Sequence, residues 1–547
     1  MKNTKFITLC FALLFFIKND VWAQDTLFIE EPQIPILTDC SDNVLYRLRI
    51  DNSSGNIRIF NGITILLNKA EIQKKIKSIK LYYAGTEALQ NGKKQMAPVN
   101  YMSGHNAKNN RKSNSSYSVF LTEIKHPDTK ISLLCDKKLY PGINYFWVSI
   151  EVKKNTPLET TFKTSIQNAY ADEKELTLSY TGEKNRVRRL AFGLRHTGDD
   201  GSAAFRIPGL VTSLNGTLLS VYDIRHNNSA DLQEYVEIGL SRSVNGGKTW
   251  EKMRTVLSFA NEGGLPPAQN GVGDPSILVD EKTGHIWVIA AWTHGMGNSR
   301  AWWSSHDGMN KERTAQLVLT KSEDDGKSWS KPINITEQVK HPSWKFLLQG
   351  PGCGITMKDG TLVFPIQFID SVHLPHAGIM YSKDHGQNWT IHQPARSNTT
   401  EAQVAEISPG ILMLNMRDNR GGSRAVAITS DLGKTWTEHS SSRKALPEPV
   451  CMASLLQVDA DKNITGRDIL LFSNPDDTKN RKRITIKASL DKGLTWPKKY
   501  HLLLDEEEGW GYSCLTLIDN EHIGIIYEGS RAHLVFQKIK ITDIITE

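Results

Sequence analysis

Cysteine is scarce in this chain of 547 residues, and no long apolar run follows the first two dozen residues. The six cysteines are widely spaced and include no Cys-x-x-Cys or Cys/His arrangement, so the sequence predicts no zinc site. We expect most of them to be buried free thiols, and a disulfide between Cys40 and Cys135 stays open. No cluster of ligand-type residues implies a metal or an organic cofactor.

An excess of charge of one sign is also missing. The 66 Lys and Arg residues nearly balance 59 Asp and Glu residues, which leaves a formal net charge of +7, and the two signs alternate along the chain. A nucleic-acid-binding protein would show a clustered basic face, so this class is excluded. The small basic excess is compatible with a small anionic substrate.

The first 23 residues have the pattern of an export signal. Lys2 and Lys5 precede an apolar run from Phe6 to Ile17, and Val21-Trp-Ala23 follows. A charged start, a short apolar middle and a final small residue are typical of a secretory signal peptide, and the run is too short to span a bilayer comfortably. We therefore predict cleavage after Ala23 and a secreted protein, periplasmic or extracellular, without a membrane span.

Residues 24–185 contain short runs of alternating apolar and polar side chains, separated by turn residues. The runs Val44–Ile50 and Asn144–Ile150 are rich in β-branched and aromatic residues, which is typical of half-buried antiparallel strands. We expect an N-terminal β-sandwich over these residues. No catalytic constellation is visible in it, and a carbohydrate-binding module and a rigid spacer fit it equally well.

Residues 186–547 contain the pattern Ser/Thr-x-Asp-x-Gly-x-Thr-Trp five times. The copies are Ser243–Trp250, Ser322–Trp329, Ser382–Trp389, Thr429–Trp436 and Ser489–Trp496. The Asp accepts hydrogen bonds from its own turn, the Gly adopts positive φ without steric cost, and the Trp packs beneath the turn. Because Asn245 replaces Asp in the first copy, we assign the repeat a structural role. One such turn per four-stranded sheet is what a β-propeller blade needs.

Further motifs lie between the repeats. In chain order they are Phe205-Arg-Ile-Pro208, Tyr222-Asp-Ile-Arg225, Gly273-Asp-Pro275, Glu401-Ala-Gln-Val-Ala-Glu406, Leu414-Asn-Met-Arg417, Ser473-Asn-Pro475, Gly511-Tyr-Ser513 and Tyr527-Glu528. With the repeats, they resemble the bacterial sialidases (exo-α-neuraminidases) with Asp boxes, similar to the secreted enzymes of gut Bacteroides-type anaerobes. The resemblance covers residues 190–547. It implies an all-β protein in which a six-bladed β-propeller catalytic domain, residues 186–547, follows the N-terminal domain.

The resemblance implies that Arg206, Arg417 and Arg481 bind the carboxylate of a sialic acid. Guanidinium groups stay charged at any relevant pH and can bind a carboxylate through two parallel hydrogen bonds. The resemblance also implies that Glu528 neutralises and orients Arg206, because clustered arginines repel one another.

Three further roles follow from the resemblance, with Tyr512 as nucleophile, Glu401 as its base and Asp231 as general acid/base. A neutral phenol avoids the repulsion that a carboxylate nucleophile would meet at an anomeric centre bearing a negative charge. Tyrosine has a usual pKa near 10, so it needs a partner that takes its proton. Arg225 and Asp274 are implied to lie near the 4-hydroxyl and N-acetyl groups of the sugar.

Alternatives stay open at this point. Glu406 competes with Glu401 as the base, and Arg420, Arg424 and Arg483 lie near the chosen arginines. The implied function is a retaining exo-α-sialidase that hydrolyses terminal sialic acid from glycoproteins, glycolipids and oligosaccharides without a cofactor. A non-catalytic sialoglycan-binding propeller, a trans-sialidase and a hydrolase of a related nonulosonic acid are the alternatives. The sequence does not determine linkage preference or oligomeric state.

Overall fold

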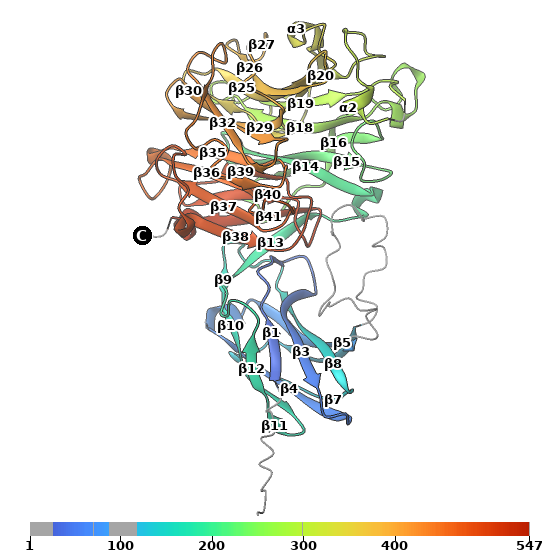
Figure 1. The fold of residues 1–547 in the computed structure, drawn as a ribbon, viewed down its shortest axis with the longest axis vertical. Coiled ribbons are helices and arrows are strands. Elements are labelled where there is room, and N and C mark those ends of the chain that lie inside the picture. Colours follow the sequence, from blue (N-terminus) through green and yellow to red (C-terminus); the bar gives the residue numbers. More distant parts are fainter. Residues whose placement is uncertain (1–25, 69, 87–117, 298, 546–547) are drawn as a thin grey trace, which may run out of the picture.

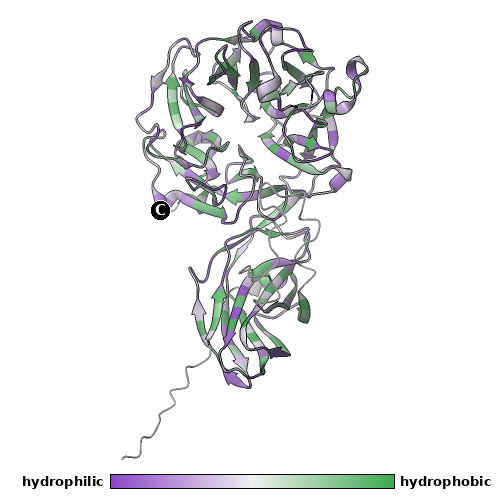
Figure 2. Ribbon diagram, turned by 45° about the vertical axis from the view of Figure 1, so that its right-hand side comes forward, coloured by the Kyte–Doolittle hydropathy of each residue, from purple (hydrophilic) through white to green (hydrophobic). Residues whose placement is uncertain are grey.

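The computed structural model describes residues 26–297 and 299–545, apart from residues 69 and 87–117. The predicted signal peptide, residues 1–23, lies outside the described residues. The fold is all-β, as the sequence predicts, and apolar residues are concentrated in the strands (Figures 1 and 2). Among the described residues, no helix combines the length and apolar character needed to cross a bilayer.

Two sheets make up most of the N-terminal part. The larger contains β12 (Thr177–Tyr180), β1 (Thr26–Glu30), β3 (Asn43–Asn52), β8 (Gly142–Val152), β5 (Ile76–Thr86) and β6 (Val119–Lys125) in this order. The smaller contains β11 (Lys174–Glu175), β10 (Thr164–Ala171), β4 (Arg58–Leu67) and β7 (Lys130–Leu139), and the short helix α1 (Ala70–Gln73) follows β4. The rings of Phe60 in β4 and Phe146 in β8 lie 4.6 Å apart, so the two sheets share one apolar core.

Six larger sheets and one two-stranded sheet follow in the described part of the chain. The first contains β14 (Ala204–Thr212), β15 (Leu218–Arg225), β16 (Val236–Ser243) and β17 (Arg254–Leu257). The second contains β18 (Val272–Val279), β19 (Ile286–Trp292), β20 (Gln316–Ser322), β21 (Ile333–Asn334) and β23 (Gly352–Cys353). The third contains β22 (Phe346–Gln349), β24 (Ile355–Thr356), β25 (Leu362–Ile369), β26 (Pro375–Ser382), β27 (Thr390–Ile391) and β28 (Arg396–Ser397). The fourth contains β29 (Thr399–Ser408), β30 (Ile411–Asp418), β32 (Ala425–Thr429) and β33 (Thr437–Glu438). The fifth contains β35 (Ser454–Val458), β36 (Ile469–Pro475), β37 (Ile484–Ser489) and β38 (His501–Asp505). The short strands β31 (Gly422–Ser423) and β34 (Pro447–Glu448) pair with each other, and α2 (Ala301–Ser304) and α3 (Thr336–Val339) lie in connections.

The sixth sheet joins the two ends of this region. Its strands β39 (Ser513–Leu517), β40 (His522–Tyr527) and β41 (Leu534–Lys540) come from the C-terminal end, whereas β13 (Arg188–Arg195) comes from the beginning. β13 pairs antiparallel with β41. It also pairs with two short strands of the N-terminal part, parallel with β2 (Ile36–Leu37) and antiparallel with β9 (Thr161–Phe162). This pairing fixes the N-terminal part against the sixth sheet.

The repeated octapeptides form turns between strands, and the predicted structural role is confirmed. Asp324 Oδ1 accepts a hydrogen bond from the backbone N–H of Ser328 at 2.8 Å. Asn245 Oδ1 accepts one from the backbone N–H of Thr249 at 3.0 Å in the first copy. Asn therefore serves the turn as Asp does, because the turn needs only an acceptor at this position.

The five cysteines that the structure describes are free thiols, as most of them are predicted to be. They are Cys40, Cys135, Cys353, Cys451 and Cys514, of which the last three are buried. Cys40 and Cys135 form no disulfide.

Substitution of Gly247 by alanine would show how tightly the first repeat turn packs on the residues beneath it. Its φ is +84° and a Cβ there would overlap the Phe536 ring, whereas Gly216, with φ +75°, has no atom within 4 Å of such a Cβ. Left-handed backbone costs alanine about 1–2 kcal/mol at both positions, and overpacking adds about 1–3 kcal/mol at Gly247 only. Gly247→Ala is therefore expected to lower the free energy of unfolding more than Gly216→Ala in denaturant titrations. Equal losses would show that the Phe536 contact is unimportant.

Candidate active site

Three predicted site residues lie at irregularities in the first strands of their sheets. The strand register shifts after Arg206 in β14, around Asp274 in β18 and around Glu401 in β29. Asp274 itself has a positive φ of 58°, and Ile207, next to Arg206, has one of 59°. A β-bulge re-aims side chains, and left-handed backbone at non-glycine residues is concentrated at functional sites. The bulges therefore explain how regular strands bring Asp274 and Glu401 to one pocket and Arg206 next to the ring of Tyr512.

Tyr512, which directly precedes β39, lies against Glu401 and Arg417. Its hydroxyl donates a hydrogen bond to Glu401 Oε1 at 2.5 Å, and Arg417 Nη1 lies 3.0 Å from the hydroxyl oxygen and 2.5 Å from Glu401 Oε2. Burial raises the pKa of Tyr512 well above 10, and the negative charge of Glu401 adds to this effect. The positive charges of Arg417 and Arg481 act in the opposite direction but are outweighed. The phenol therefore keeps its proton until a base removes it, and the Glu401 carboxylate is in place to do so.

Glu528, directly after β40, is fully buried and accepts four N–H groups. Arg206 donates to it through Nε at 3.0 Å and Nη2 at 3.2 Å. The backbone N–H groups of Ile207 and Tyr512 donate at 2.9 Å and 3.1 Å. The carboxylate thus neutralises Arg206 and fixes the backbone on both sides of the site.

The three predicted arginines converge on Tyr512 from different sheets. The guanidinium carbons of Arg206 and Arg481 lie 5.4 Å and 5.7 Å from the centroid of its ring, and Arg417 contacts its hydroxyl. Arg481, in the connection between β36 and β37, is held by the backbone oxygens of Trp510 at 3.1 Å and Val450 at 3.2 Å. The three positive charges therefore surround one point, which suits an anionic group.

Asp231 lies in the connection between β15 and β16, beside two arginines. Its Oδ1 accepts a hydrogen bond from Arg225 Nη1 at 2.8 Å and lies 3.7 Å from Arg206 Nη1. Burial acts to raise the pKa of Asp231, but the charges of Arg225 and Arg206 outweigh it and hold the pKa below its usual range. Arg225 is itself buried and also donates to Asp223 and to the backbone oxygen of Ser229. Its contacts suit it to hold Asp231.

Asp274 has the opposite protonation tendency. Burial raises its pKa well above the usual range, and the negative charges of Asp223 and Asp231 add to this effect. Asp223 Oδ1 accepts the backbone N–H of Asp274 at 2.8 Å. Asp274 therefore tends to be neutral while Asp231 is ionised.

A cavity of about 390 Å³ lies over these residues. Its lining includes Asp231, Asp274, Glu401, Arg417, Tyr512 and, on the apolar side, Ile207, Leu232, Phe346 and Leu348. Arg300, Trp302 and Trp303, in and next to α2, also line it. The acidic, histidine and cysteine side chains of this cavity form no group with metal-ligand spacing among the described residues.

The sequence predicted no role for Asp223, beside Asp274, or for Trp302 and Trp303, which line the cavity. Asp223 belongs to the Tyr222-Asp-Ile-Arg225 motif, and this position could have marked it as a candidate site residue. The pair Trp302–Trp303 stands in a polar, Gly-rich stretch, where adjacent tryptophans signal an exposed aromatic surface; Trp303 is 65% exposed.

Three competing residues have other partners. Glu406, near the far end of β29, accepts the backbone N–H groups of Lys358 at 2.8 Å and Gly410 at 2.7 Å. Arg420 donates to Asp418, and Arg424 is fully buried against Glu448. The hydrogen bond to Tyr512 therefore belongs to Glu401, and Arg417 is the arginine of its segment that contacts Tyr512.

A phenol with a base, a second acid and three arginines around it provides the groups that a glycosidase for an anionic sugar needs. Residues 24–175 match the family described as the N-terminal domain of BNR-repeat neuraminidase, and residues 207–523 match the BNR repeat-like domain. A sialidase of Bacteroides fragilis is 61% identical over 526 residues, which is 96% of each chain, and one of Clostridium perfringens is 31% identical over 60% of this chain and 87% of its own. The solved Hadza microbial sialidase Hz136 is 54% identical, with a TM-score of 0.90, over 95% of this chain and all of its own. The chain belongs to the sialidase family of BNR-repeat glycoside hydrolases.

Glu528→Gln tests the buried carboxylate. Each oxygen of Glu528 accepts two N–H groups, so an amide NH₂ in either orientation would face two donors. We expect a loss of about 3–5 kcal/mol in the free energy of unfolding and a large fall in kcat/KM on a sialoside. Glu406→Gln is the matched control, because Glu406 also accepts two backbone N–H groups but lies away from Tyr512, and it should keep near wild-type activity. The reverse ranking in activity would contradict the assignment.

Proposed function

We propose that this enzyme is a retaining exo-α-sialidase that releases terminal sialic acid from glycoproteins, glycolipids and oligosaccharides. The observation that carries the proposal is the 2.5 Å hydrogen bond from Tyr512 to Glu401 inside a group of three arginines. Sialic acid bears a carboxylate on its anomeric carbon, so the arginines would hold that group next to the phenol. The high identity to sialidases supports the same substrate class.

The scaffold would be a six-bladed β-propeller over residues 186–547, behind an N-terminal domain of residues 24–185. Contacts between β14 and β18, β19 and β22, β25 and β29, β29 and β35, β35 and β39, and β39 and β14 support a closed ring of sheets. The pairing of β13 with β41 would close the ring by joining its first and last strands. The protein would be exported, with residues 1–23 removed as its signal peptide.

In the first displacement, Arg206, Arg417 and Arg481 bind the carboxylate of the substrate. Asp231 donates a proton to the leaving glycosidic oxygen as its bond to the anomeric carbon breaks. Glu401 takes the proton of Tyr512, whose oxygen forms a covalent bond to the anomeric carbon. The phenol is neutral when it approaches, so it does not repel the substrate carboxylate.

In the second displacement, Asp231, now ionised, takes a proton from a water molecule that attacks the anomeric carbon. The bond to Tyr512 breaks, and Glu401 returns the proton to the phenol oxygen. Two inversions at the same carbon give net retention, so the first product is the α-anomer.

The charge of the bound substrate would prepare Asp231 for its role as an acid. In the free enzyme, Arg225 and Arg206 hold the pKa of Asp231 low, so the carboxyl is ionised and cannot donate a proton. A substrate carboxylate bound to Arg206 offsets part of that positive charge. The pKa of Asp231 would therefore rise when the substrate binds, and the enzyme would take up a proton.

Tyr512→Phe is expected to lower kcat on a 4-methylumbelliferyl sialoside by roughly 10³-fold or more, because the nucleophile is lost and the ring remains. Tyr381→Phe is the control, since Tyr381 contacts His392 away from the cavity, and it should retain activity. Proton NMR of the wild-type reaction should show the α-anomer first. A β-anomer at early times, or near wild-type turnover of Tyr512→Phe, would exclude the mechanism.

Proton uptake at Asp231 is measurable by calorimetry in buffers that differ in ionisation enthalpy. Because the pKa of Asp231 is low in the free enzyme and rises on binding, sialic acid should bind with proton uptake at mildly acidic pH. The uptake should vanish as the pH rises above the pKa of the complex. Asp231→Asn should remove it while the neutral Asp274 stays in place. Uptake that persists in this variant would assign the proton to another group.

A further inference from the structure

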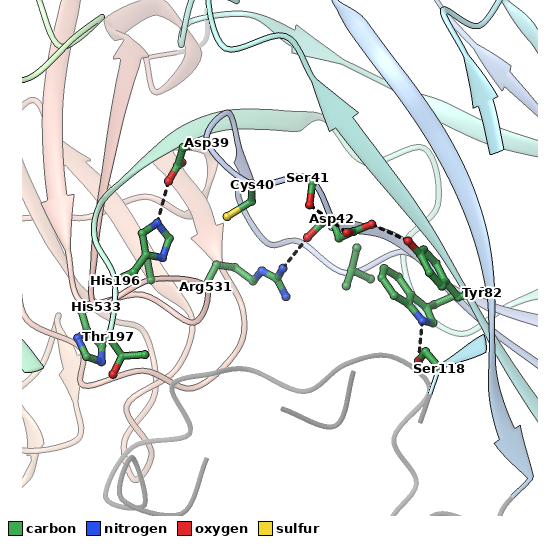
Figure 3. A pocket seen from close by; sticks show the side chains of 13 residues that line it. Asp39, Cys40, Ser41, Asp42, Tyr82, Ser118, His196, Thr197, Arg531 and His533 are labelled. Carbon is green, nitrogen blue, oxygen red and sulfur yellow. Dashed lines mark hydrogen bonds and ion pairs between the residues drawn. The ribbon is translucent and has the colours of Figure 1, made fainter. Parts of the chain in front are cut away.

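A second cavity, of about 550 Å³, lies where the N-terminal part meets the sixth sheet of the C-terminal part (Figure 3). Asp39 and Cys40, in the turn after β2, line one side of it. His196, directly after β13, and Arg531, between β40 and β41, come from the C-terminal part. The proposed mechanism uses none of these side chains.

We propose that Asp39, Cys40 and His196 form a binding site for a divalent cation of the zinc class. A carboxylate oxygen, a sulfur and a ring nitrogen from these residues lie within 4.8 Å of one another. Zinc binds this mixture of ligands, because it is a borderline-soft ion that accepts sulfur, nitrogen and oxygen donors in a tetrahedral arrangement. Calcium and magnesium require oxygen ligands and do not fit this set.

Gly193 leaves the space in which these ligands meet. A Cβ at this position would overlap His196 Nε2 and would lie 2.8 Å from Asp39 Oδ2. Gly193 is not among the glycines with positive φ, so its backbone does not require glycine. The missing side chain is therefore needed for the approach of His196 and Asp39, which any other residue would block.

The ligands are already oriented in the structure. Asp39 Oδ1 accepts the backbone N–H of Gly193 at 2.9 Å, which leaves Oδ2 directed at His196 Nε2, 2.7 Å away. Two ligand atoms on one tetrahedral zinc ion lie roughly 3.3 Å apart, given bonds of about 2.0–2.1 Å, so the pair needs to open by only about 0.6 Å. Support of this kind from a second group is typical of metal ligands.

Binding of the cation changes the charges and the protons of Asp39, Cys40 and His196. The cation replaces the His196–Asp39 hydrogen bond, and the Cys40 thiol releases its proton to solvent when it binds as thiolate. The two negative charges of Asp39 and Cys40 then offset the cation. Arg531 opposes binding as a neighbouring positive charge, but its Nη2 is engaged with the backbone oxygen of Asp42 at 3.0 Å. The cavity leaves room for a water molecule as fourth ligand.

A bound ion would connect the N-terminal part to β13. Asp39 and Cys40 follow β2, which pairs with β13, and β13 pairs with β41. The ion would therefore act as a structural link at the junction of the two parts, separate from the Tyr512 cavity.

Cobalt is the probe for the test, because Co²⁺ bound to a thiolate gives a charge-transfer absorption band in the near ultraviolet. The full chain is stripped with chelator and titrated with Co²⁺, and then with Zn²⁺ in competition. Wild type and Cys135→Ser, which removes a half-buried thiol outside the cluster, should show the band at one equivalent. Cys40→Ser should lose the band, and His196→Gln should bind at least about 10-fold more weakly. Turnover of a sialoside should stay unchanged in all of them, which separates this site from the proposed catalysis.

A second measurement uses only the wild-type protein and so does not depend on the folding of the variants. Saturating Zn²⁺ should slow the alkylation of Cys40 at least about 10-fold, read by peptide mass spectrometry, while the alkylation of Cys135 serves as the internal standard. The proposal is overturned if no charge-transfer band forms, if the band survives in Cys40→Ser, or if Zn²⁺ leaves the alkylation rate of Cys40 unchanged.

Discussion

The carboxylate of Glu528 is the group on which the site depends. It is fully buried and would be costly to keep charged without partners, but it accepts two N–H groups of Arg206 and the backbone N–H groups of Ile207 and Tyr512. These contacts connect β14, which carries Arg206 and Ile207, to the sheet that contains β39 and β40. They also allow Arg206 to lie near two other arginines, because the negative charge offsets part of the repulsion between them.

The charges and the burial around Tyr512 give the nearby acids different protonation states. Asp231, next to Arg225 and Arg206, is held ionised, whereas Asp274, buried beside Asp223 and Asp231, tends to be neutral. Tyr512 stays protonated because burial outweighs the effect of the arginines. Groups with pKa values pushed in opposite directions in one pocket are typical of acid–base chemistry. The binding of an anionic sugar would shift this balance, so substrate binding and proton transfer would be coupled.

The sequence predicted much of the fold and the site, for reasons that lie in short segments. Alternating strands and the repeated turns are local patterns, and the hydrogen bonds of Asp324 and Asn245 stay within their own turns. Motif spacing favoured Arg417 over Arg420 and Arg424, whereas the resemblance implied Glu401 as the base and left Glu406 as its competitor. The contributions of Asp223 and of Trp302 and Trp303 were not predicted, because Asp223 acts through Asp274 of the neighbouring sheet and the tryptophans line a cavity whose other walls come from distant parts of the chain.

The sequence by itself determined the strands, the turns and the residue types of the site, because these depend on side-chain periodicity and on backbone preferences within a few residues. Only the tertiary structure decided which charges meet. Arg206 and Glu528 are far apart in the chain, and so are Cys40 and His196, so no spacing rule relates them. They come together because β13 pairs with the last strand, β41, and because bulges in the first strands of the sheets turn selected side chains into a common pocket. A single sequence does not show which distant strands pair, because that pairing depends on the packing of the whole domain.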